Sequence, residues 1–122
     1  MTAAKDLMGL GFAWPVAQAE GYSSVAITAA GSTTTDATVC DGQNDFFIMT
    51  ATGADGIRMN GSAPLLTEII VVNTSGSIGK VYPSSGGNFN GLSTDTAISV
   101  GANKSLMLMR YSTNGWQSNL SA

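Results

Sequence analysis

The side chains with the greatest capacity for chemistry in this sequence are its carboxylates, and they are scattered along the chain. Hydrolysis of a glycosidic bond needs two carboxyl groups that flank one cleft, one of them with a raised pKa. All but one fall in expected loops or in the amino-terminal segment, where Asp commonly hydrogen-bonds the turn backbone. Glu68 alone lies inside an apolar run, and strand alternation predicts that it faces solvent. The full set is Asp6, Glu20, Asp36, Asp41, Asp45, Asp55, Glu68 and Asp95. Their spacing predicts no catalytic acid pair.

Nucleophilic and metal chemistry are limited by the absence of His and by a single cysteine, Cys40. Ser-His-Asp and Cys-His hydrolases are therefore excluded, and no ligand set for a transition metal is present. We expect Cys40 to be a small buried apolar residue at the end of a strand. Residues 41–45 cluster oxygen ligands, but they lack the spacing and the terminal Glu of an EF-hand. The sequence predicts no enzyme activity, no cofactor and no metal site.

The charge of the chain restricts its partners. Five Lys and Arg against eight Asp and Glu give a net charge of -3, and only 11% of residues are charged. This balance does not suit binding to nucleic acid or to an anionic membrane surface. No stretch approaches the ~20 apolar residues of a membrane span. An ordinary soluble domain carries about 25% charged residues. A weakly charged surface of small residues favours an assembly protein that contacts other subunits.

Aromatic side chains offer an alternative, because an exposed aromatic platform could bind a carbohydrate. Core and interface packing is the more common use of Tyr and Trp. The five candidates fall in different segments: Trp14, Tyr22, Tyr82, Tyr111 and Trp116. A carbohydrate-binding module therefore stays as the second hypothesis.

The elements that must position these residues are short strands. The length of 122 residues fits one domain. Apolar and β-branched runs separated by turn residues predict roughly eight strands and favour an all-β sandwich or barrel. The runs cover residues 25–28, 37–40, 46–50, 56–59, 66–73, 80–83, 97–100 and 105–111. The continuous run 46–50 predicts burial on both sides, and the alternation in 56–59 predicts burial on one. The lack of a fixed-period repeat argues against a solenoid.

The first twenty residues form a separate unit in this interpretation. We expect an extended N-terminal arm at residues 1–20 and a β-rich domain at residues 21–122. Asp6, Gly9 and Pro15 distinguish the arm from a secretory signal. Its apolar side chains cannot stay exposed as one patch, so the arm either folds back on its own domain or docks on a neighbour. The expected contact residues are Leu7, Leu10, Phe12 and Trp14.

The order of several short motifs resembles small structural proteins of tailed bacteriophages. In that group a Thr/Ala-rich strand precedes a G-hydrophobe-R turn, a V-x-N strand, a V-Y-P strand, an N-G pair and a closing Trp. The resemblance spans about residues 22–118. The matching segments are Ile27 to Thr38, Gly56 to Met59, Ile69 to Asn73, Val81 to Pro83, Asn90 to Leu92, Val100 to Ala102 and Trp116.

This resemblance implies a virion structural protein of the head decoration (cement) type, built as a β-rich domain that forms a homotrimer. The implied partners are the major capsid protein and other copies of the chain, and the implied location is the capsid exterior. A tail fibre or spike module carries the same strand pattern and stays as an alternative. The apolar arm favours the head, where we expect it to lie along the shell.

Overall fold

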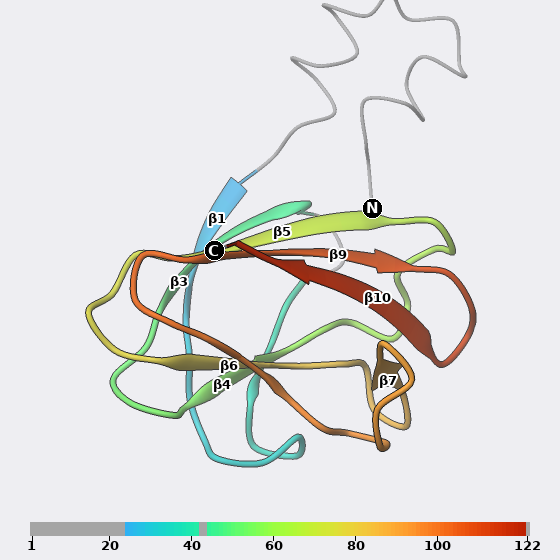
Figure 1. Cartoon of the computed structure of the whole chain (residues 1–122), viewed down its shortest axis with the longest axis horizontal. Helices are drawn as coiled ribbons and strands as arrows, with labels where there is room; N and C mark the ends of the chain where they lie inside the picture. Colours follow the sequence, from blue (N-terminus) through green and yellow to red (C-terminus); the bar gives the residue numbers. More distant parts are fainter. Residues whose placement is uncertain (1–23, 42–43, 122) are drawn as a thin grey trace, which may run out of the picture.

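The computed structural model describes residues 24–41 and 44–121, which form ten strands and no helix. The strands make two sheets that lie one over the other (Figure 1). In spatial order, sheet A holds β1 (Ser24–Thr28), β3 (Phe46–Thr50), β5 (Glu68–Asn73), β9 (Ser105–Arg110), β10 (Gly115–Leu120) and β7 (Asn88–Phe89). Sheet B holds β2 (Thr38–Val39), β4 (Gly56–Arg58), β6 (Gly79–Tyr82) and β8 (Ile98–Val100). Within these ranges no helix is long and apolar enough to cross a membrane.

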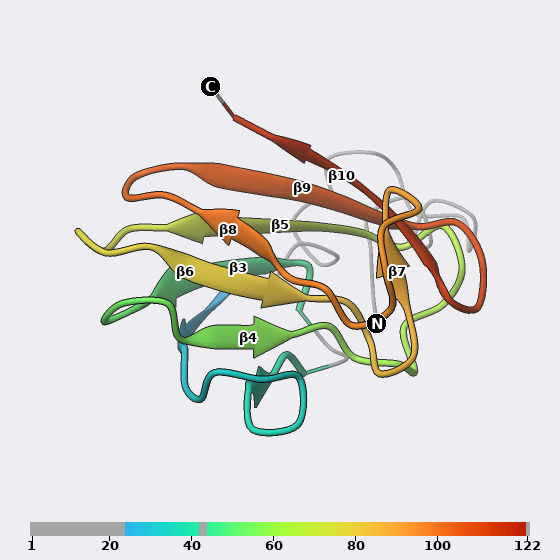
Figure 2. The same cartoon turned by 60° about the horizontal axis from the view of Figure 1, so that its bottom comes forward.

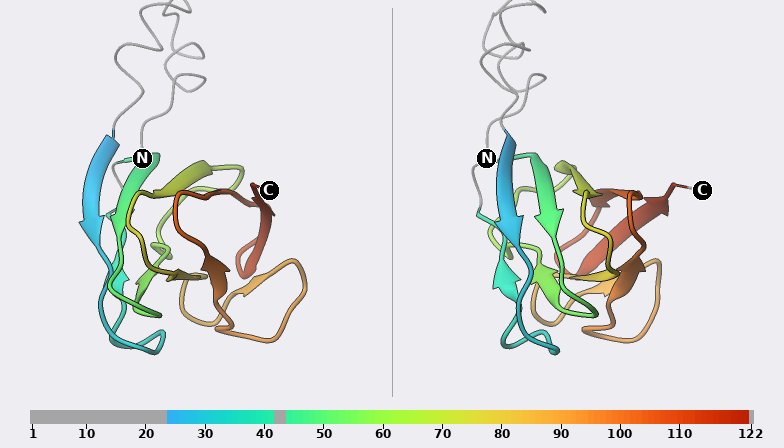
Figure 3. Two further views of the ribbon diagram at one scale, coloured as in Figure 1. Left: turned by 60° about the vertical axis from the view of Figure 1, so that its left-hand side comes forward. Right: turned by 90° about the vertical axis from the view of Figure 1, so that its left-hand side faces the viewer.

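The first six strands wind as a solenoid-like coil, because the chain alternates between the two sheets at each strand. The odd strands β1, β3 and β5 are parallel neighbours in sheet A, and β2, β4 and β6 are parallel neighbours in sheet B. Then β8 and β9 run back antiparallel to β6 and β5, side by side with them (Figure 2). The hairpin partner β10 takes sheet A to its far side, opposite β1 in both views of Figure 3.

The all-β class is confirmed, but the prediction that the chain is not a solenoid is wrong for the first six strands, which form a solenoid-like coil. Aligned positions in sheet B step from Thr38 to Ile57 and then from Ile57 to Val81, so successive coils differ in length. A coil that varies in this way leaves no fixed period in the sequence. The parallel pairing joins residues far apart in the chain and has no local signal.

One core lies between the sheets, and strand alternation supplies it. Phe47, Met49 and Val71 point inward from sheet A, and Ile57 and Val81 face them from sheet B. All are fully buried, and each contributes about 1.5–3 kcal/mol by leaving water. The antiparallel strands complete the core with Leu106, Leu108 and Trp116.

The predicted strands are found at all eight expected places, with small differences at their ends. Pro83 follows the last residue of β6, as expected of a residue that has no backbone N–H to donate. Asn90 and Gly91 have φ values of 54° and 75°, which fits the predicted type I′ turn. The prediction misses β7, which has only two residues, and β10, whose outward positions are polar.

Candidate functional site: the outer face of sheet A

The central strands of sheet A, β3, β5 and β9, carry apolar residues on both faces, although sheet B covers only one of them. Phe47 and Met49 enter the core from β3, while the alternate residues Phe46 and Ile48 point away from it and are half-buried. The registers of β5 and β9 continue this outward surface across the sheet. We define the apolar patch as Phe46, Ile48, Ile70, Val72, Met107 and Met109. Strands buried on both faces read as continuous apolar runs, whereas a sheet with one solvated face alternates apolar and polar residues. The outer face of these three strands therefore has the composition of a contact surface.

The patch has an uncharged rim that is polar except for Ala26. Ser24, Ala26 and Thr28 occupy the outward positions of β1, and Gln117 and Asn119 occupy those of β10. Within these strands the single charged residue at an outward position is Glu68, opposite Met109 at one end. An apolar centre with depleted charge, enriched in Met and aromatic residues and surrounded by a polar rim, is the usual anatomy of a protein interface.

A strained turn lies at the same end of sheet A. Pro64 to Thr67 form a turn in which the Thr67 N–H donates to the Pro64 carbonyl at 3.2 Å. Leu66, its third residue, has a φ of 66°, a conformation that side-chain-bearing residues avoid and Gly adopts. Leu65 and Leu66 are both more than half exposed. The turn therefore holds two bulky apolar side chains in solvent beside the patch, at a cost in backbone strain.

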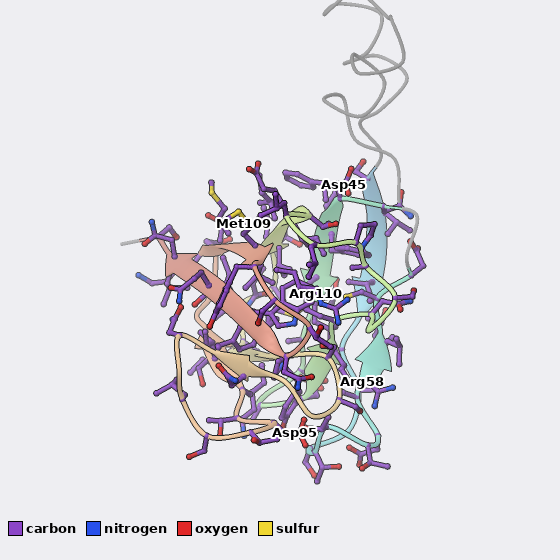
Figure 4. All side chains as sticks on the ribbon, turned by 90° about the vertical axis from the view of Figure 1, so that its right-hand side faces the viewer. Asp45, Arg58, Asp95, Met109 and Arg110 are labelled. Carbon is purple, nitrogen blue, oxygen red and sulfur yellow. The ribbon has the colours of Figure 1, made fainter. Side chains whose placement is uncertain are left out.

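The last two residues of β9, Met109 and Arg110, point to opposite faces of sheet A. Figure 4 shows Met109 on the outside of the molecule and Arg110 between the ribbons. The Arg110 guanidinium donates to the carbonyls of Gly61, Ala63 and Thr113 and lies 5.8 Å from the centre of the Trp116 ring. Arg110 thus fastens two loops over the core and has a structural role.

No family model, curated protein or solved structure matches this chain. The site is therefore assessed from its own geometry. Leu7, Leu10, Phe12 and Trp14, the contact residues expected from the sequence, lie outside the described residues. The outward residues of β5 and β9 were not among the predicted contacts, although their signal was present: both strands are continuous apolar runs rather than alternating ones. The sequence predicts that residues 46–50 are buried on both sides. This is wrong for the part of the chain that the structure describes, because sheet B covers only the inner face of β3.

Two of the described carboxylates, Asp36 and Asp55, hydrogen-bond the backbone of their own turns. Asp36 accepts hydrogen bonds from the Thr33 hydroxyl and N–H, both at 2.8 Å, and these bonds hold its pKa below the usual range. Burial alone would raise the pKa of Asp55, but hydrogen bonds from Thr52 and Gly53 outweigh it and lower the pKa. Asp45 and Asp95 lie at opposite ends of the view in Figure 4.

The remaining candidates for chemistry are the buried Cys40 and the exposed Asp41. Cys40 is buried as predicted, and burial raises the pKa of its thiol to about 12, which removes the reactive thiolate at neutral pH. Asp41 accepts hydrogen bonds from the N–H and the side-chain amide of Asn44. Residues 24–41 and 44–121 contain no group of three or more His, Cys, Asp or Glu that could hold a metal.

The described aromatic residues do not form a sugar platform. Trp116 is fully buried, and its indole N–H donates to the Ser84 hydroxyl at 3.1 Å. Tyr82 is also buried, and its hydroxyl donates to the Ser32 carbonyl at 2.9 Å. Tyr111 is exposed. A ring edge or face that is inside the core cannot stack on a glycan, so the carbohydrate hypothesis loses two of its candidates.

Proposed function

We propose that this chain is a virion structural protein of the head decoration type, which binds the outer surface of an assembled capsid as a homotrimer and stabilises the shell. The observation that carries the proposal is the apolar patch on sheet A, where Glu68 is the single charged residue at the outward positions of the described strands. A domain with such a patch is equipped for contact with protein. The order of motifs that resembles phage structural proteins selects the kind of assembly.

The mechanism needs binding energy and geometry alone. A subunit that binds the assembled shell and not its dissociated parts stabilises the shell by its binding free energy. Linking three subunits raises the effective concentration for the second and third contacts. A standard interface of about 800 Å² per partner is within reach of a domain of this size. Leu7, Leu10, Phe12 and Trp14 are the proposed capsid or subunit contacts.

The proposal is tested by the thermal rupture of heads prepared without this protein. Purified full-length chain is added at increasing concentration, and DNA release from the heads is followed on heating. The proposal predicts a rupture temperature that rises with concentration and reaches a plateau when the sites are full. A rupture temperature that does not move at any concentration would refute the decoration function.

A tail fibre or spike module is the alternative from the same resemblance. It predicts a stable oligomer that leaves the rupture temperature of heads unchanged.

A further inference from the structure

The apolar patch on sheet A needs a cover that no described strand provides. Its central pair, Ile70 and Met107, lies in the middle of the sheet, and Met107 is 55% exposed. Contiguous apolar surface of this kind is rarely left in water. The cover must be apolar, uncharged, and able to cross several strands.

We propose that residues 10–16 of the same chain dock across the outer face of sheet A. This segment has apolar side chains at every second position, namely Leu10, Phe12, Trp14 and Val16. The intervening residues are Gly11, Ala13 and Pro15. An extended segment with this alternation presents one large apolar side and one small side, which is the shape that a flat sheet face can take.

The charges of the two surfaces agree. No charged residue lies between Asp6 and Glu20 in the sequence, and Glu68 is the single charged residue at the outward positions of sheet A. Aromatic rings also suit Met107 and Met109, since thioether sulfurs make favourable contacts with ring edges. A charged ligand would find no complement on this face.

The chain length and attachment point favour docking within one molecule. Residue 23 adjoins Ser24, the first residue of β1, and β1 is an edge strand of sheet A. The four strands from β1 to β9 span about 14 Å at ~4.8 Å spacing. Residues 10–16 extend over about 20 Å, and residues 17–23 supply a connection of similar reach. A tether this short gives an effective concentration in the millimolar range, which favours the chain's own arm over a separate partner.

Docking of residues 10–16 is a property of the isolated chain, so it can be tested in the absence of heads and independently of the proposed decoration function. In the free subunit, residues 10–16 lie on the outer face of sheet A. Binding to a shell would replace this contact with an apolar contact between the arm and the shell. The arm would then be held in place before assembly rather than exposed.

The test uses the two tryptophans of the chain, Trp14 and Trp116. Trp116 is fully buried, so acrylamide quenching of the full-length protein reports on Trp14. The inference predicts that both tryptophans are protected in the unmodified protein, at all concentrations down to those at which the chain is monomeric. Met107→Lys should expose Trp14 and increase quenching several-fold.

Leu92→Lys is the matched control, because Leu92 is 51% exposed and lies outside sheet A. It should leave quenching unchanged. In a Trp14→Phe background, Met107→Lys should also have no effect, which assigns the signal to the arm. If Met107→Lys also exposes Trp116, the variant has lost its fold. The quenching of Met107→Gln is then compared with that of Leu92→Lys and the unmodified protein, and it should again show exposure of Trp14 alone.

Three results would overturn the inference. The first is a Trp14 that is freely quenched in the unmodified protein. The second is equal quenching in Met107→Lys and Leu92→Lys. The third is protection that disappears on dilution, which would assign the cover to a second copy of the chain.

Discussion

Ile70 on β5 and Met107 on β9 are directly opposed across an antiparallel pair, and both side chains point out of sheet A. Their sequence neighbours Ile69, Leu106 and Leu108 point inward and are buried. The two central strands thus carry apolar residues on both faces, which is the pattern of a sheet that is covered twice. This relationship underlies both the proposed assembly function and the proposed position of the arm.

The first prediction concerns the arm on the capsid. Replacing Phe12 and Trp14 together with Ala should abolish occupancy of heads, because the largest apolar contacts of the arm are removed, while the β-rich domain keeps its fold. Quantitative gel analysis of purified decorated heads measures occupancy, and circular dichroism checks the fold. Full occupancy by the double variant would show that the arm is not the anchor.

The second prediction concerns Arg110, whose guanidinium reaches three loop carbonyls from inside the molecule. Arg110→Lys keeps the charge but loses the planar fork. We expect a loss of about 1.5–3 kcal/mol in the free energy of unfolding, the usual size for a hydrogen bond to a charged group. Urea denaturation measures it. Lys80→Arg, at a half-exposed position of β6, is the control and should change stability little.

The third prediction concerns the strained turn before β5. Leu66 has a positive φ and Leu65 does not, while their exposed fractions are nearly equal at 56% and 57%. Leu66→Gly should raise the free energy of unfolding by up to about 1 kcal/mol. Relief of about 1–2 kcal/mol of backbone strain stabilises the folded state, and the greater entropy that Gly gives the unfolded chain offsets part of this gain. Leu65→Gly should lower it. Thermal melts of both variants suffice, and a destabilised Leu66→Gly would contradict the strain.

The fourth prediction is a pH dependence set by turn carboxylates. Hydrogen bonds hold the pKa values of folded Asp36 and Asp55 below the usual value of 3.8. Between the folded and the unfolded pKa values, the unfolded chain binds more protons than the folded chain. The contribution of the two turns to the free energy of unfolding is therefore complete above about pH 4 and is lost as the pH falls through the folded pKa values. The double variant Asp36→Asn, Asp55→Asn should show a weaker fall in melting temperature with acid than the unmodified chain.

Glu68→Gln serves as the control for this measurement. It removes an exposed carboxylate that takes no part in the two turns, so it controls for the loss of a negative charge as such. Equal acid dependence in the double variant and the unmodified chain would contradict the assigned role of the turns.

The strands could be predicted where the local sequence carries the signal. Residues 69–72 are all β-branched, and Pro83 ends β6 because it cannot donate to the ladder. The exposed position of Glu68 also follows from alternation. These features depend on a few neighbouring residues, so they need no knowledge of the rest of the fold.

The winding and the assembly of the outward apolar residues into one patch could not be predicted, because both depend on which strands become neighbours. The parallel partners of β3 are β1 and β5, which are far away in the sequence. The residues from Phe46 to Thr50 carry no signal that indicates these partners. The same run predicted cover on two faces, whereas the described strands cover one. That difference is the physical reason to look for a cover in residues 10–16.

Sedimentation velocity of the purified full-length protein, alone and then with heads that lack it, tests the proposed decoration function. We expect a species near three times 12.4 kDa that moves with the heads when they are added. Because few charges are involved, binding should change little between about 0.05 and 0.5 M salt. A chain that sediments independently of the heads at every concentration would contradict the proposed function.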